Sequence, residues 1–124
     1  MQSRVDFRRH RMAAGIKRVG MVIGLKEERS AEYFALHAPE SPGVRKLLKA
    51  ANMRNFSIFV TRFPDNRLYL FGYYEYAGSD FDTDQSWLAE QIENKAWLAQ
   101  CDPMQSPLSG SDSWQLMDTV YFNE

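Results

Sequence analysis

A tyrosine and a histidine four positions apart are the residues of this chain best placed to do chemistry. On a helix, Tyr33 and His37 would stand one turn apart on the same face. Pro39 is expected to end that helix, because the residue before a proline is pushed out of the helical region. An imidazole gives or takes a proton near neutral pH, and a phenol donates a hydrogen bond. The pair predicts proton transfer to and from the oxygens of a small molecule.

The sequence carries no motif for a cofactor or a metal ion. His10 lies far from His37, Cys101 is the single cysteine, and no HExxH, paired CxxC or EF-hand spacing occurs. There is also no GxGxxG, no Walker phosphate loop and no GxSxG motif. A Ser-His-Asp triad assembled in space stays open. We therefore expect chemistry that protons alone perform, with no cofactor and no metal.

Length and composition indicate one globular domain. The chain has 124 residues, of which 44% are hydrophobic and 14% aromatic, and its formal net charge is -1. Such a balance offers no overall electrostatic attraction to nucleic acid. No apolar run approaches the length of a membrane span, and one cysteine cannot form an internal disulfide. We expect a cytoplasmic protein that binds neither nucleic acid nor a membrane.

The N-terminal residues differ from the rest of the chain. Residues 1–16 carry four arginines and His10 without apolar periodicity, which predicts a flexible basic tail. A nucleic-acid-binding arm is the alternative, but the run is short and no second basic patch supports it. Residues 17–124 are then the single folded domain.

The first half of this domain reads as a strand followed by two helices. Residues 19–25 alternate as a strand, and residues 26–38 are helical. After a break at residues 39–43, residues 44–51 form a second short helix. The apolar stripe of that helix consists of Val44, Leu47, Leu48 and Ala51.

The second half begins with an antiparallel hairpin, because residues 54–63 and 67–76 alternate around a short turn. Residues 82–100 predict one helix, capped by Asp82 or Thr83. Its expected inward residues are Trp87, Ile92, Trp97 and Leu98. An irregular loop follows, and residues 114–122 alternate as a last strand. One face of that strand would carry Trp114, Leu116, Val120 and Phe122.

This order of elements predicts an α+β fold of the ferredoxin-like βαββαβ type, an antiparallel sheet with helices on one face. The opposite face would carry four rings, those of Phe59, Tyr69, Phe71 and Tyr73. An exposed aromatic face is typical of a binding surface. We therefore expect a homodimer in which two sheets face each other around a two-fold axis.

Several of these features together resemble the L-rhamnose mutarotase family, from about residue 17 to the C-terminus. The resemblance is carried by Tyr33-x-x-x-His37-x-Pro39, Asn55-Phe56, Trp97, Ser106-Pro107 and Val120-Tyr121-Phe122. It implies a dimeric α/β barrel built from ferredoxin-like domains. It also implies a cofactor-free enzyme that interconverts the anomers of a free monosaccharide.

The resemblance also implies roles for individual residues. His37 matches the family's proton donor, and Tyr33 matches a tyrosine that contacts the sugar. Phe56 stands where the family has a second tyrosine, so a hydroxyl is missing, and Phe56 and Trp97 are the candidates for stacking on the sugar. The family also has tryptophans at the positions of Ala96 and Ser41. These departures leave L-rhamnose, L-fucose or another uncommon hexose open as the substrate.

Two other functions fit the same fold. One is a cofactor-free monooxygenase that acts on an aromatic substrate in a more apolar pocket. The other is a non-catalytic sugar-binding or regulatory dimer, which the missing tyrosine and tryptophans favour. Measuring exchange between sugar anomers separates the three, because only a mutarotase accelerates it.

Overall fold

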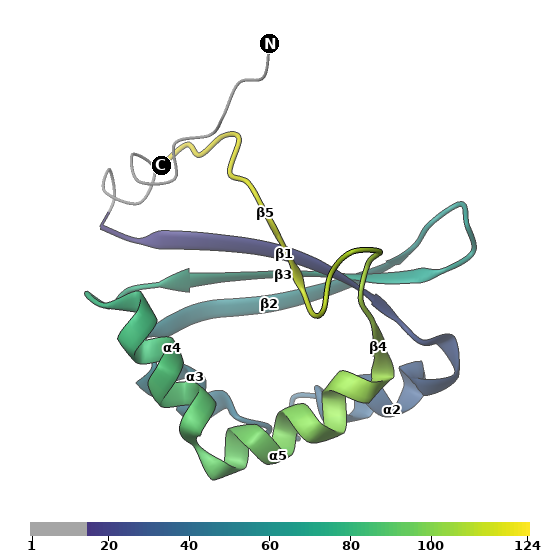
Figure 1. Ribbon diagram of the computed structural model, residues 1–124, viewed down its shortest axis with the longest axis horizontal. Coiled ribbons are helices and arrows are strands. Elements are labelled where there is room, and N and C mark those ends of the chain that lie inside the picture. The colour runs from purple at the N-terminus through teal and green to yellow at the C-terminus, as the bar shows by residue number, and fades with distance from the viewer. Residues whose placement is uncertain (1–14) are drawn as a thin grey trace.

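The computed structural model describes residues 15–124. The basic tail predicted for residues 1–16 lies outside this part of the chain, apart from its last two residues. From Lys17 onward the chain alternates between strands and helices in the order that the sequence predicts (Figure 1).

The strands form an antiparallel sheet in the order β2-β3-β1-β4, with β5 also pairing with β1. Their bounds are β1 Lys17–Leu25, β2 Met53–Arg62, β3 Leu68–Tyr76, β4 Gln105–Ser106 and β5 Gln115–Met117. The predicted hairpin is confirmed, since β2 and β3 pair over most of their length with a bulge between Arg54 and Ser57. This strand order is that of a ferredoxin-like domain, so the predicted α+β fold is confirmed.

The helices lie on one side of the sheet (Figure 1). Their bounds are α2 Ser30–Leu36, α3 Arg45–Ala50, α4 Phe81–Glu90 and α5 Ile92–Cys101, with short 3₁₀ helices η1 Glu27–Arg29 and η2 Asp102–Met104. The helix that ends before Pro39 and the short helix after it are therefore confirmed. Burial also alternates along β3, with Leu70, Gly72, Tyr74 and Tyr76 buried toward the helices.

The core between the sheet and the helices consists of two clusters. One contains Val19, Met21, Ala51, Met53, Tyr74 and Leu88. The other contains Ile23, Leu25, Tyr33, Leu70, Cys101 and Met104. Trp114 packs against both clusters and joins them. Burial of these side chains provides the main driving force for folding.

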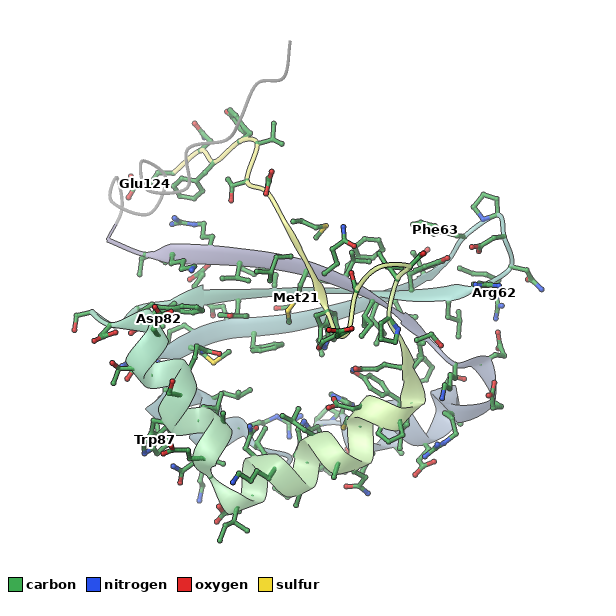
Figure 2. All side chains as sticks on the ribbon, viewed as in Figure 1. Met21, Arg62, Phe63, Asp82, Trp87 and Glu124 are labelled. Atoms are coloured by element: carbon green, nitrogen blue, oxygen red, sulfur yellow. The ribbon has the colours of Figure 1, made fainter. Side chains whose placement is uncertain are left out.

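The prediction of a single helix over residues 82–100 is wrong, because this segment forms two helices, α4 and α5. Gln91 between α4 and α5 has an extended backbone (φ -72°, ψ 132°) and interrupts the helical hydrogen bonds. Three residues expected to face inward are instead exposed: Ile92 is 80% exposed, Leu98 41% and Trp87 38%. Trp87 lies on the side of α4 away from the sheet (Figure 2). Leu88 is the buried residue of α4, while Trp97 does face inward.

The last strand expected over residues 114–122 is also wrong in extent. Only Gln115–Met117 pairs with β1, opposite residues 20–22, and the following residues leave the sheet edge. Leu116 and Val120 are exposed, so alternation in this segment does not reflect a buried face. Part of the edge is formed earlier, by β4 opposite Gly24 and Leu25, inside the segment expected to be an irregular loop.

The N-cap of α4 differs from the one that the sequence predicts. Asp80, rather than Asp82 or Thr83, takes this position, and its carboxylate accepts a hydrogen bond of 3.1 Å from the backbone N–H of Thr83. This bond satisfies one of the backbone donors that the first turn of a helix leaves unpaired.

We predict that Asp80→Ala destabilises the protein by about 0.5–2 kcal/mol, the usual effect of losing an N-cap. Asp82→Ala, in the exposed first turn of the same helix, is the matched control and should cost less. Urea unfolding followed by circular dichroism measures both. Equal losses in the two variants would contradict the assignment of Asp80 as the cap.

Candidate active site

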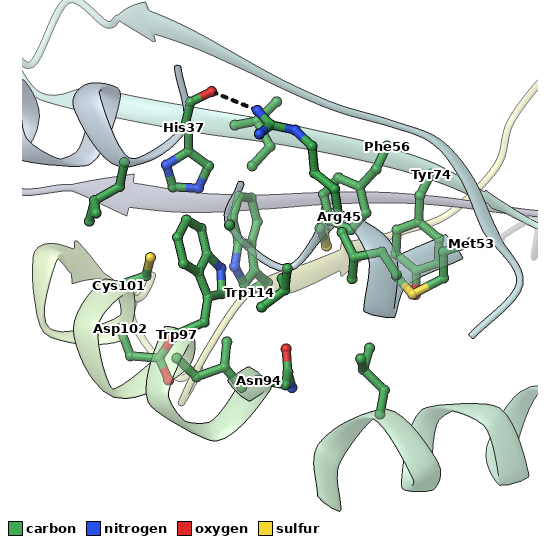
Figure 3. A pocket seen from close by; sticks show the side chains of 18 of the residues that line it. His37, Arg45, Met53, Phe56, Tyr74, Asn94, Trp97, Cys101, Asp102 and Trp114 are labelled. Atoms are coloured by element: carbon green, nitrogen blue, oxygen red, sulfur yellow. Dashed lines mark hydrogen bonds between the residues drawn. The ribbon is translucent and has the colours of Figure 1, made fainter. Parts of the chain in front are cut away.

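A cavity of about 530 Å³ lies between the helices and the sheet. Its volume is within the range of roughly 300–1,000 Å³ that is usual for small-molecule sites. Side chains from all four α-helices and from β1, β2 and β3 line it, and most of its surface is apolar. Figure 3 shows these side chains converging from the helices and the sheet. The fold therefore provides room for a monosaccharide-sized ligand next to the residues of interest.

The predicted pair, Tyr33 and His37, lies side by side at one end of this cavity. The two rings are stacked with their centroids 4.2 Å apart and their planes 25° apart. Tyr33 is on α2, and His37 is the residue that ends this helix. Tyr33 is buried, His37 is half-buried, and both line the cavity. Their four-residue spacing on one helix face is confirmed.

One hydrogen bond determines which tautomer the neutral His37 ring adopts. Its Nδ1 lies 2.7 Å from the backbone carbonyl oxygen of Tyr33. A carbonyl only accepts hydrogen bonds, so Nδ1 must carry the proton and donate it. In the neutral ring, Nε2 then has the free lone pair, because the partner of one ring nitrogen determines which nitrogen is protonated. Nε2 is thus the atom of His37 that can exchange a proton with a ligand.

Residues that follow α2 hold the end of this helix in place. The Ser41 hydroxyl donates a hydrogen bond of 2.9 Å to the carbonyl of Ala35. The guanidinium of Arg45 on α3 donates to the carbonyls of His37 (3.2 Å) and Ala38 (3.1 Å). These donors satisfy carbonyls that a helix end leaves unpaired. They therefore fix the backbone that carries the imidazole.

The Tyr33 hydroxyl accepts a hydrogen bond of 3.0 Å from the amide of Gln105, the first residue of β4. Burial raises the pKa of Tyr33 to about 12, although the Gln105 bond opposes the shift. The phenol is therefore neutral at pH 7. Because its oxygen already accepts from Gln105, its own proton is available for a ligand.

Two acidic groups border the same region. Burial raises the pKa of the Cys101 thiol to about 11, with a smaller contribution from the nearby Asp102 carboxylate. The thiol is thus protonated and a poor nucleophile at neutral pH. Burial also raises the pKa of Asp102 above its usual value.

The two aromatic candidates for stacking on a sugar also line the cavity, from opposite sides. Trp97 on α5 approaches the His37 ring edge-on, with centroids 5.0 Å apart (Figure 3). Phe56 on β2 is stacked on Tyr74 at 5.1 Å. Ala96 and Ser41, where the resemblance implied tryptophans, are not among the residues that line the cavity. The structure therefore brings together Tyr33, His37, Trp97 and Phe56 around one space.

Sequence reasoning missed the polar residues that surround the pair. Gln105 and Arg45 hold Tyr33 and the end of α2, and Tyr74 and Asn94 line the cavity. Asn94 gave a usable signal, because it lies three residues before Trp97 and so shares its helix face. Gln105 gave none, since its contact with Tyr33 joins positions 72 residues apart.

Within residues 15–124, no three His, Cys, Asp or Glu side chains come together as a set that could hold a metal ion. In the same part of the chain, no helix is both long enough and apolar enough to cross a membrane.

Fold and site together define a small ferredoxin-like α+β domain with an internal cavity and a stacked tyrosine–histidine pair at one end. The L-rhamnose mutarotase family model matches residues 18–122, which is most of the chain. The protein therefore belongs to the L-rhamnose mutarotase family, a family of isomerases. No curated protein matches the sequence.

Two solved structures are similar to this chain. An L-rhamnose mutarotase from Formosa agariphila matches with a TM-score of 0.63 and 19% identity, over 86% of this chain and 98% of that one. A protein named as an antibiotic biosynthesis monooxygenase from Nitrosomonas europaea matches with a TM-score of 0.49 and 12% identity, over 86% and 91% of the two chains. At 19% identity, the similarity to the Formosa agariphila structure shows the fold alone.

Burial of the Tyr33 phenol leads to a prediction about pH. Its pKa of about 12 exceeds the value of 10.0 in an exposed tyrosine, so the folded protein holds this proton more tightly. The stabilisation is complete below pH 10 and is lost as the pH rises toward 12. The loss amounts to roughly 2–3 kcal/mol, since one pKa unit corresponds to about 1.4 kcal/mol.

We therefore predict that the stability advantage of the wild type over Tyr33→Phe shrinks between pH 9 and pH 11.5. Other tyrosines titrate alike in both proteins, so the difference isolates Tyr33. Urea unfolding at several pH values measures it, and an advantage independent of pH would refute the prediction.

Proposed function

We propose that this protein is a mutarotase that interconverts the α and β anomers of a free deoxyhexose, L-rhamnose or a related sugar such as L-fucose. Family membership supports the reaction class. The cavity beside His37 and Tyr33 supports the site, because it leaves room for a pyranose next to both groups. The observation that carries the proposal is the hydrogen bond from His37 Nδ1 to the Tyr33 carbonyl, which leaves Nε2 free for proton transfer.

The reaction needs one proton to move between two oxygens of the sugar. Nε2 of His37 takes the proton of the anomeric hydroxyl and returns a proton to the ring oxygen, so the bond from C1 to the ring oxygen breaks and an aldehyde forms. Both oxygens are bonded to C1, so one imidazole beside this carbon can serve both. Rotation about the C1–C2 bond and closure on the other face of the aldehyde then give the other anomer.

Tyr33 and the aromatic residues assist this step. The neutral Tyr33 phenol donates a hydrogen bond to whichever sugar oxygen gains negative charge, since Gln105 already occupies one of its acceptor positions. Trp97 and Phe56 offer ring faces to the apolar C–H face of the sugar. General acid-base catalysis of this kind contributes roughly 10²–10⁴-fold, enough for a reaction that already proceeds slowly in water.

We predict that His37→Ala abolishes the acceleration of anomer exchange, because no other side chain of the proposed pair can accept the anomeric proton at neutral pH. Saturation-transfer NMR between the α and β signals of L-rhamnose and L-fucose measures the exchange, and circular dichroism checks that the variant is folded. Ile92→Ala, at an exposed position of α5, is the control and should keep full activity.

The outcomes separate the alternatives. Unchanged exchange in a folded His37→Ala variant would remove the proposed role of the imidazole. A wild-type protein that shifts sugar signals without speeding their exchange would be a non-catalytic sugar-binding protein. Oxygen consumption with an aromatic substrate, without any effect on sugars, would identify a monooxygenase.

We also propose that the protein is a homodimer that buries the sheet face opposite the helices. Phe59 is 65% exposed there and pairs directly with Phe71 on β3. Phe63 lies against Tyr69 and Phe71, with centroids 4.5 and 6.0 Å away, so the rings form one continuous surface. Self-association around a two-fold axis would bury this surface on both copies. A cytoplasmic location stays a prediction.

We predict that Phe59→Glu converts the dimer to a monomer, since it would place a charge in an apolar interface. Ile92→Glu introduces the same charge at a more exposed apolar residue on the helix side, 80% against 65% for Phe59, and should not change the mass. Sedimentation equilibrium measures both variants. A wild-type monomer, or a Phe59→Glu dimer, would refute this interface.

A further inference from the structure

Two polar side chains that face the cavity have no hydrogen-bond partner within the described part of the chain. Tyr74 is 6% exposed and Asn94 is 5% exposed, and both line the cavity. No side-chain polar atom of the described residues is both sealed from solvent and unpaired, so the polar ends of Tyr74 and Asn94 open into the cavity that they line. Figure 3 shows Tyr74 extending from the sheet and Asn94 from α5 into the space between them.

Such groups are available to a ligand in the cavity. A hydroxyl or amide at the cavity wall that no protein group pairs bonds to water when the cavity is empty, and a ligand hydroxyl can take the place of that water. Native proteins pair nearly all of their buried polar groups, so unpaired ones at the wall of a cavity indicate that something else supplies the partner. Burial raises the pKa of Tyr74, which keeps its hydroxyl neutral and able both to donate and to accept.

The position of Tyr74 relates it to the hydroxyl that the chain lacks at Phe56. The two rings are stacked 5.1 Å apart on neighbouring strands, and both line the cavity. A phenol is therefore present next to Phe56, on the neighbouring strand β3 rather than on β2. It is on the face of the strand that is buried toward the helices.

The position of Asn94 relates it to the other end of the cavity. It lies three residues before Trp97 on α5, which places the two residues on one helix face about 4.5 Å apart along the axis. Trp97 contacts His37, so Asn94, three residues earlier on α5, lies further along the cavity from His37. This spacing is comparable to the width of a pyranose ring.

We propose that the Tyr74 hydroxyl and the Asn94 amide bind the sugar hydroxyls remote from the anomeric carbon, those on C3 and C4, and so determine which sugar is accepted. This inference rests on the proposed function of the cavity. With C1 next to His37, C4 lies across the ring. The two groups orient the sugar and take no part in proton transfer.

The first test removes each group without changing its volume much. We expect Tyr74→Phe and Asn94→Leu each to raise KM for L-rhamnose by roughly 3- to 10-fold in the anomer-exchange assay, the effect of one neutral hydrogen bond, with little change in kcat. Neither variant should lower the melting temperature, because the free protein loses no hydrogen bond. A purely structural role would lower it.

Tyr76→Phe is the matched control. It deletes the same atom from the same strand face, but the Tyr76 hydroxyl donates to Asp84 and accepts from the backbone N–H of Asp80, outside the cavity. This variant should lower the melting temperature and leave KM unchanged.

The second test pairs each variant with 3-deoxy and 4-deoxy analogues of L-rhamnose. If Tyr74 or Asn94 binds one of these hydroxyls, the wild type discriminates against the matching analogue and the variant does not. Accelerated exchange in the wild type with unchanged KM in both variants would overturn the inference and leave the mutarotase proposal intact. Binding of L-rhamnose that weakens in both variants, without accelerated exchange, would support the inference and overturn the mutarotase proposal.

Discussion

The unpaired carbonyls at the C-terminus of α2 are the constraint on which the site depends. A helix end must find donors for them, and here the donors are side chains close to the proposed reaction. The imidazole of His37 donates to Tyr33, and the guanidinium of Arg45 to the backbone of His37 itself. The same bonds that complete the helix therefore choose the tautomer of the imidazole and fix the position of its ring. Structural and chemical requirements are met by the same few atoms.

The division of the core into two clusters explains how a small domain has room for a cavity of this size. Each cluster packs helices against the sheet, and Trp114 contacts both. The extended residue Gln91 separates α4 from α5, so the two helices follow different directions over the sheet (Figure 1). One continuous helix would cross the sheet in a single direction. The domain forgoes some apolar burial at its centre, a common cost of function.

Local sequence patterns predicted most of the helices and strands. The features that they missed depend on contacts between residues far apart in the sequence. The hairpin, the Tyr33–His37 pair and the stop before Pro39 follow from alternation, spacing and proline geometry. The break at Gln91 has no glycine or proline to mark it. The short extent of β5 depends on how much of β1 remains available as an edge. Within the site, the rings were predictable, but their polar partners come from residues distant in the sequence, which no local pattern reports.

The hydroxyl of Tyr74 changes the meaning of the phenylalanine at position 56. Phe56 has no hydroxyl, whereas the resemblance to the family implies a tyrosine at this position. The cavity has a phenol on the neighbouring strand, and adjacent strands lie about 4.8 Å apart. A hydrogen bond tolerates a displacement of only a few tenths of an ångström, so one sugar stereochemistry cannot satisfy both arrangements equally. If the cavity binds a sugar as we propose, the positions of its polar atoms, rather than their number, decide between epimers, because a site built to bind a hydroxyl rejects a sugar that leaves it unpaired.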